Sequence, residues 1–139
     1  MTETIKLWIP TPPSVNQYWM QTRNGVKNTK AARKFKARVG QWVAFGIAKA
    51  RAANQLPLEC PVQLDIIHLR AGKRLIDVDN LLKGTLDALN KRIYGDDSQV
   101  VDLRIRRGPI VGKGAGLAIR IGAAEQMKTA PEWALNLCA

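Results

Sequence analysis

The spacing of apolar residues changes repeatedly along this chain of 139 residues, and this pattern restricts its possible folds more than any other feature. Residues 5–9 alternate apolar and polar side chains until Pro10 interrupts them, which predicts a short strand and a turn. From residue 29 to residue 53, apolar residues recur every three or four positions. That period predicts one long amphipathic helix with a basic exposed face.

The second half of the chain repeats this change of period. Residues 62–69 are rich in β-branched and aliphatic side chains and predict a buried strand. A helical stripe over residues 80–94, followed by Gly95, predicts a second helix. Residues 101–106 and 117–121 alternate on either side of a glycine-rich turn, which predicts a closing hairpin. The expected fold is therefore α/β, with the order β-α-β-α-β-β and a mixed sheet with packed helices.

Length and composition favour a single soluble domain. No apolar run approaches the roughly 20 residues of a membrane span, and the first residues lack the features of a secretory signal. Cys60 and Cys138 have no Cys or His neighbour at metal-ligand spacing, which indicates reduced thiols and a cytoplasmic location. We expect one domain over residues 1–122 and a tail over residues 123–139, where Trp133, Leu135 and Leu137 can dock on the body or on a second subunit.

The balance of charge predicts an anionic partner. The formal net charge is +11, and seven basic residues lie between residues 23 and 38 with no acid among them. Neutralised phosphates release counterions, so such a patch supplies affinity that is largely independent of base sequence. Nucleic acid is the favoured partner, and a merely solvated helix face is the alternative.

The acids are concentrated elsewhere. Six of the eleven acidic residues fall within residues 77–102 of this basic chain. Asp77 and Asp79 are two residues apart, and in an extended backbone such side chains point the same way and can reach one cation. Lys83 follows Asp79 by four residues, one helical turn along the same flank. Carboxylates that hold Mg²⁺ against phosphate oxygens would explain acids inside a protein that attracts polyanions.

Each of these acids also has a structural interpretation. Either Asp77 or Asp79 can be the N-cap of the second helix. Asp79, Lys83, Asp87 and Lys91 form an alternating i,i+4 series, and we assign Asp87 to such a surface ladder.

The acids after the second helix have structural interpretations as well. Asp96 and Asp97 follow a glycine and can form a tight turn. We place Asp102 outside the metal site, where it can pair with Arg104, Arg106 or Arg120.

Four runs of residues resemble one known family. They are residues 9–19, 77–83, 87–89 and 95–102, and together they are similar to the RusA family of Holliday junction resolvases. The resemblance spans roughly residues 5 to 122. It implies the small α/β fold of that family, a homodimer, and Mg²⁺-dependent resolution of four-way DNA junctions in recombination and repair, often encoded by phages and prophages.

The resemblance also implies roles for particular residues. It places the metal-binding acids at Asp77, Asp79 and Asp97, with one or two Mg²⁺ ions, or Mn²⁺ as a substitute, and the catalytic lysine at Lys83. Asp96 matches a neighbouring acid of less defined role. Lys83 can orient or deprotonate the attacking water or stabilise the oxyanion. A basic run that often precedes the first acid is reduced here to Lys73 and Arg74.

Several residues are candidates for contacts with branched DNA. Asn16 can bind the DNA backbone or close an Asx-turn. Tyr18 and Trp19 can wedge or stack at the crossover, although we favour core packing for Trp19. Lone His68 is assigned no role. The alternatives to a resolvase are a non-catalytic DNA-binding protein and a general or RNA-directed metal nuclease. The DNA-binding candidates are Asn16, Lys30, Arg33, Lys34, Arg38, Lys73 and Arg74.

Overall fold

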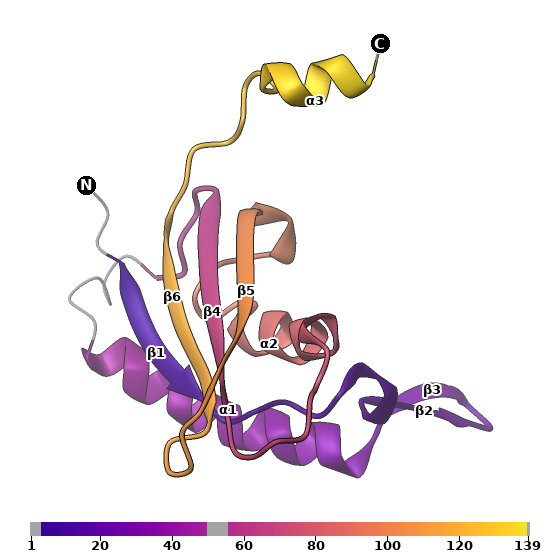
Figure 1. The fold of residues 1–139 in the computed structure, drawn as a ribbon. Coiled ribbons are helices and arrows are strands. Elements are labelled where there is room, and N and C mark those ends of the chain that lie inside the picture. The colour runs from indigo at the N-terminus through magenta and orange to yellow at the C-terminus, as the bar shows by residue number, and fades with distance from the viewer. Residues whose placement is uncertain (1–3, 50–55, 139) are drawn as a thin grey trace.

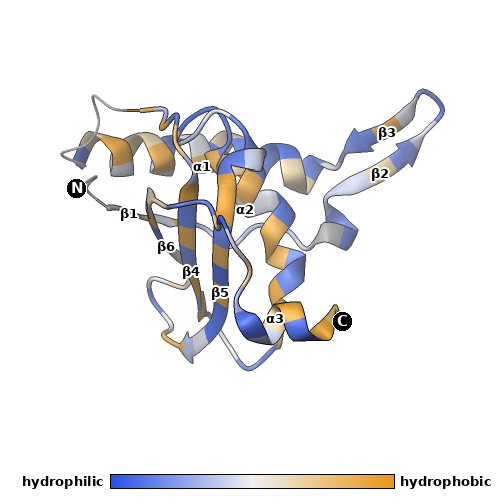
Figure 2. Cartoon of the chain, turned by 90° about the horizontal axis from the view of Figure 1, so that it is seen from above, coloured by the Kyte–Doolittle hydropathy of each residue, from blue (hydrophilic) through white to orange (hydrophobic). Residues whose placement is uncertain are grey.

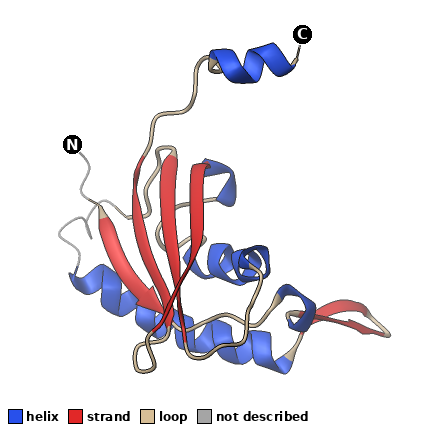
Figure 3. Ribbon diagram, in the orientation of Figure 1, coloured by secondary structure: helices blue, strands red, loops and turns tan. Residues whose placement is uncertain are grey.

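A computed structural model describes residues 4–49 and 56–138. A four-stranded mixed sheet in the order β1-β6-β4-β5 forms the body, and a separate two-stranded hairpin, β2–β3, projects away from it (Figures 1 and 3). This arrangement confirms the expected α/β class and mixed sheet. The strands are β1 (Ile5–Ile9), β2 (Trp19–Thr22), β3 (Gly25–Asn28), β4 (Val62–Arg70), β5 (Val100–Ile110) and β6 (Gly116–Ala123). The helices are α1 (Lys30–Lys49), α2 (Leu82–Leu89) and α3 (Glu132–Leu137), with 3₁₀ turns η1 (Val15–Gln17), η3 (Val78–Leu81) and η4 (Asp97–Gln99).

The core lies between one face of the sheet and the helices α1 and α2. Alternate residues of β4, which are Val62, Leu64 and Ile66, are buried, as the period-2 pattern requires. Phe35 and Val39 of α1 pack into the same cluster from the helix side. Each such side chain stabilises the fold by about 1.5–3 kcal/mol relative to exposure. The first strand, the first helix and the β4 strand were therefore predicted correctly from their periods, although residues 50–53 of the expected helix lie outside the described residues.

The predicted hairpin of the last two strands is wrong. β4 lies between β5 and β6, parallel to β5 and antiparallel to β6. Buried residues of β4 alternate with exposed or half-buried ones from Val62 to His68, and β4 pairs with a strand on each side, as a central strand does. β5 has mostly exposed residues, including Arg104, Arg106 and Arg107, which suits an edge strand.

The second helix is shorter than residues 80–94. It begins with η3 and ends at Leu89, because Asn90 takes an extended conformation and Lys91 has φ of 64°. The helix therefore stops five residues before the predicted end near Gly95. A left-handed residue at Lys91 reverses the chain, and Lys91 N donates to Tyr94 O at 2.7 Å.

The hairpin β2–β3 was not predicted. Its two-residue turn consists of Arg23 and Asn24, because Thr22 pairs with Gly25, and Gly25 at the start of β3 has φ of 108°. The strands are only four residues long and mostly exposed, so they carry almost no hydrophobic alternation.

The C-terminal tail does not dock on the body. Residues 124–131 carry α3 away from the sheet (Figure 1), and Trp133 and Leu137 remain 71% and 78% exposed. Docking on the body is thus wrong for the described chain, and docking on a second subunit stays a prediction. None of the helices described is long and apolar enough to cross a membrane.

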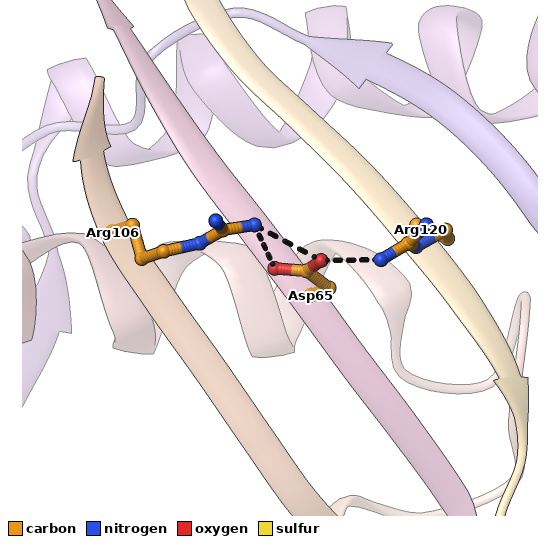
Figure 4. A network of polar contacts seen from close by, with 3 residues as sticks. All are labelled: Asp65, Arg106 and Arg120. Atoms are coloured by element: carbon orange, nitrogen blue, oxygen red, sulfur yellow. Dashed lines mark hydrogen bonds and ion pairs between the residues drawn. The ribbon is translucent and has the colours of Figure 1, made fainter.

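The second face of the sheet is open and charged. Asp65 of β4 accepts hydrogen bonds from Arg106 at 3.1 Å and from Arg120 at 2.8 Å, across the two neighbouring strands (Figure 4). These arginines were expected to pair with Asp102, which is exposed on β5. Asp65 lies opposite the backbone of Arg120 in the β4–β6 register, so it is the closer partner. Figure 2 shows the alternation of hydrophilic and hydrophobic residues along β4 and β5 that separates this face from the core.

Candidate active site

The predicted acid pair lies where the chain leaves β4 and enters α2. Asp77 is extended (φ −63°, ψ 137°) at the start of η3, and Asp79 lies in the first turn of η3. Both residues are exposed. Asp77 makes no side-chain capping bond, and neither residue forms an ion pair within residues 4–49 and 56–138. The capping role is thus not used at Asp77, and both carboxylates are available to a ligand.

The proline turn after β1 brings a second segment to this loop. A pocket of about 290 Å³ is lined by Asn16, Arg74, Asp77 and Asn80, together with Pro12 and neighbouring residues. Asn16 is exposed, and the η1 turn is closed by the backbone bond from Gln17 N to Ser14 O at 2.9 Å. The structure therefore joins Asn16, Arg74 and Asp77, which are far apart in the sequence.

Lys83 points toward Asp87 and Trp19. Its Nζ lies 3.0 Å from Asp87 Oδ1 and 5.8 Å from the centre of the Trp19 ring. The surface ladder thus consists of this pair, because Lys91 lies beyond the end of α2. Core packing of Trp19 is wrong, since Trp19 is 41% exposed and its neighbour Tyr18 is fully buried.

Two buried tyrosines lie within the influence of the Asp87 charge. Burial and then the charge of Asp87 raise the pKa of Tyr18 to about 12. Burial also raises the pKa of Tyr94, with the charge of Asp97 as the next cause. Both hydroxyls therefore stay neutral at physiological pH, and they line the side of α2 that carries Asp87.

Asp96 and Asp97 have different environments. Asp96 accepts from Ser98 N at 2.9 Å and, with Gln99, forms a capping box, and the bond from Ser98 lowers the pKa of Asp96. Asp97 is half-buried, and its Oδ1 is buried without a hydrogen-bond partner among the residues that the structure describes. A buried carboxylate oxygen without a partner is costly, so Asp97 fits a cation that the protein itself does not supply.

The structure does not bring the three predicted metal ligands together. Asp97 lies near Tyr94, whose hydroxyl donates to Leu86 O in the last turns of α2, whereas Asp77 and Asp79 precede that helix. In the part of the chain that the structure describes, no group of three or more Asp, Glu, His or Cys residues is arranged to hold a metal ion. The uncommitted carboxylates fit Mg²⁺ chemically, and their convergence stays a prediction.

The predicted DNA contacts are all on the surface. The four basic residues of α1 and the two in the loop after β4 are exposed. His68 of β4 is buried, and its Nδ1 has no hydrogen-bond partner within residues 4–49 and 56–138. Burial, followed by Arg70 and Arg107, lowers the pKa of His68. The exposed basic residues are Lys30, Arg33, Lys34, Arg38, Lys73 and Arg74.

Comparison with known proteins matches this chain to one family of nucleases. The family model described as endodeoxyribonuclease RusA matches residues 10–122. The chain is 30% identical over 119 residues to the crossover junction endodeoxyribonuclease RusA of Escherichia coli K12, which covers 85% of this chain and 93% of the relative. It is 29% identical, with the same coverage, to the corresponding protein of Enterobacteria phage 82. A shorter match, 64% over 31 residues and 22% of each chain, is to the uncharacterized protein YqaN of Bacillus subtilis.

Proposed function

The chain belongs to the RusA family of endodeoxyribonucleases, and from this premise we propose that it resolves four-way DNA junctions by Mg²⁺-dependent hydrolysis of paired phosphodiester bonds. The observation that carries this proposal is the state of Asp77 and Asp79. They are exposed just before α2 and form no ion pair with any described residue, in a chain of net charge +11. Carboxylates in such a chain have many possible cationic partners, so an unpaired adjacent pair indicates a ligand site.

The candidate residues have different proposed roles. Asp77, Asp79 and Asp97 would hold the metal, which when bound lowers the pKa of a water and neutralises charge on the phosphate. Lys83 is one turn beyond Asp79 and can orient or deprotonate the attacking water, or offset charge on a phosphate oxygen. Asn16 lines the same pocket as Asp77 and can hold the DNA backbone there.

The position of Asp97 limits how the metal site can be completed. Either the loop that carries Asp77 and Asp79 moves toward Asp97, or a second subunit supplies the third acid. Mixing Asp77→Asn subunits with Asp97→Asn subunits distinguishes these routes. Shared sites would restore part of the cleavage in the mixture, whereas sites within one subunit would leave the mixture inactive.

A homodimer suits the substrate. A four-way junction has pseudo-two-fold symmetry, so two subunits with one site each can make symmetric nicks. Phosphates of the arms would contact the basic residues of α1 and the loop after β4, with shape selecting the branch point. Sedimentation of the protein with and without junction DNA measures the stoichiometry.

The central experiment compares cleavage of four-way, three-way, flap and linear DNA, and of RNA, at equal salt with Mg²⁺ or EDTA. We expect cleavage of the four-way junction with Mg²⁺, some support by Mn²⁺, and none with EDTA. Asp77→Asn should abolish cleavage but leave junction binding in EDTA, because a metal ligand is lost while the basic surface is kept. Asp102→Asn is the matched control, since Asp102 is also exposed but lies on β5.

Three outcomes would contradict the proposal or its assignment of the site. Binding without cleavage under every metal condition would indicate a non-catalytic DNA-binding protein. Equal cleavage of linear DNA or RNA would indicate a general nuclease. Cleavage by Asp77→Asn at the wild-type rate would remove Asp77 from the site.

A further inference from the structure

The hairpin β2–β3 is an exposed arm that the fold itself does not use. It projects from the body in two perpendicular views (Figures 1 and 2), and its described residues include cations but no acid. Met20 and Val26 are 39% and 60% exposed. An arm that combines apolar and basic side chains offers phosphate attraction and an apolar surface to the same partner.

The base of this arm is fixed to the body. Thr29 N donates to Tyr18 O at 3.0 Å, and the Thr29 hydroxyl also donates to Gln17 O. The same hydroxyl accepts from Ala32 N at 3.1 Å, which caps the start of α1. The first residue of β2, Trp19, therefore has a defined position relative to α1.

Trp19 is located next to the candidate active site. Its ring centre is 5.5 Å from that of buried Tyr18, edge to face, and 5.8 Å from Lys83 Nζ. In the hairpin register Trp19 pairs with Asn28 and Gln21 pairs with Val26, so Trp19, Gln21 and Val26 lie on one face of the hairpin. That face begins at Lys83 and continues outward along the arm.

An indole that is 41% exposed beside a catalytic lysine has no role in the core. The rings of tryptophans stack on unpaired bases of any sequence, and a neighbouring cation strengthens such sites. At a four-way junction the bases that flank the branch point are the ones that unstack at least cost. The partner that fits this face is thus a nucleobase at the branch point.

We propose that Trp19 stacks on a base at the branch point and thereby aligns the adjacent phosphate with Lys83, while the rest of the hairpin lies along the DNA arm. This inference rests on the proposed function, because it assigns a substrate contact to the same site. It assigns Trp19 a positioning role that depends on junction shape and not on sequence.

The test is a cycle of protein and DNA changes. Trp19→Ala and Trp19→Phe are compared with Trp133→Ala, which removes a tryptophan that is 71% exposed from the distant tail. Junction affinity is measured in EDTA, and single-turnover cleavage in Mg²⁺, on intact junctions and on junctions with abasic sites beside the branch point. Thermal unfolding of each variant shows that the fold is retained.

We expect Trp19→Ala to weaken junction binding or cleavage by about tenfold or more, as loss of one stacked base predicts, with Trp19→Phe close to wild type. The abasic junction should cost the wild type the same factor and Trp19→Ala almost nothing. 2-Aminopurine at the branch point should be quenched by the wild type and by Trp133→Ala but not by Trp19→Ala. The proposal would be overturned if Trp19→Ala lost the same factor in binding or cleavage, relative to wild type, on intact and on abasic junctions. It would also be overturned if Trp19→Ala and Trp133→Ala bound and cleaved junctions equally well.

The measurements distinguish a failure of this inference from a failure of the proposed function. If the proposed function is wrong, the wild-type protein will cleave no junction with Mg²⁺, whatever residue occupies position 19. If only this inference is wrong, the wild-type protein will cleave junctions, and cleavage will not depend on Trp19 or on the base at the branch point.

Discussion

Replacing Gly84 with alanine tests whether the close contact between α2 and the proline turn sets the geometry of the site. A Cβ on Gly84 would lie 2.6 Å from Pro12 Cβ and 3.4 Å from Tyr18 Cε2. Carbon atoms pack at about 3.5–4.0 Å, and the proline ring cannot rotate away, so α2 must retreat by about 1 Å. Lys83 and Asp79 would move with it, away from Asn16.

The two contributions to stability oppose each other. Alanine favours a helix interior over glycine by about 1 kcal/mol, while overpacking costs about 1–3 kcal/mol. The free energy of unfolding should therefore fall by about 0–2 kcal/mol. Cleavage should fall much further, by about 100-fold, because catalysis is sensitive to displacements of about 1 Å.

Urea unfolding and single-turnover junction cleavage measure the two effects separately. Gly40→Ala is the matched control in α1, because its Cβ would lie 3.1 Å from Nη2 of Arg92, the end of a flexible side chain that can move. We expect Gly40→Ala to be at least as stable as wild type and fully active. Wild-type cleavage by Gly84→Ala would refute the claim that this contact positions the site.

Two further predictions concern charge. Burial disfavours ionisation of Asp65, but hydrogen bonds from its two arginines outweigh it and lower its pKa. The stability from this carboxylate is thus complete above the unfolded pKa, about 3.9, and is lost as pH falls through the lower folded pKa. Asp65→Asn should cost about 1 kcal/mol in urea at pH 7, since both arginines are exposed, and this cost should decrease as the pH falls below about 3.9. A cost that stays constant as the pH is lowered would contradict this prediction. Arg33→Ala should weaken binding to all DNA sequences alike and reduce the slope of log affinity against log salt by about 1, and an unchanged slope would exclude a phosphate contact.

Local periodicity was sufficient for most elements but not for strand neighbours. The alternation in β5 and β6 was read correctly, yet the two strands do not pair. Strands that are adjacent in sequence often form hairpins, and the alternation within either strand does not indicate that β4 lies between them. The signal available was composition, because the arginines and exposed apolar residues of β5 fit an edge and the apolar run of β4 fits a centre.

In the candidate site, too, local features were predicted from the sequence but the arrangement of distant residues was not. The spacing of Asp77 and Asp79 predicted two neighbouring carboxylates at the start of a helix, and the structure places them there. The position of Asp97 depends on where α2 ends, and an early end at Leu89 followed by a left-handed Lys91 was not evident from the apolar stripe. Asn90, a residue type that favours helix ends, was the signal that could have indicated it.

The acids of this chain differ in whether they have ion-pair or hydrogen-bond partners in the fold. This difference indicates which of them are available to bind a ligand. Asp87 is paired with Lys83 at 3.0 Å, and Asp96 is held in a capping box. Asp77 and Asp79 have no such partner among the described residues, although Arg74 lines the same pocket as Asp77. In a chain with 22 basic and 11 acidic residues, a cationic side chain is easily placed beside a carboxylate. Two neighbouring carboxylates that remain unpaired under those conditions repel each other, so we expect their partner to be a cation from outside the chain.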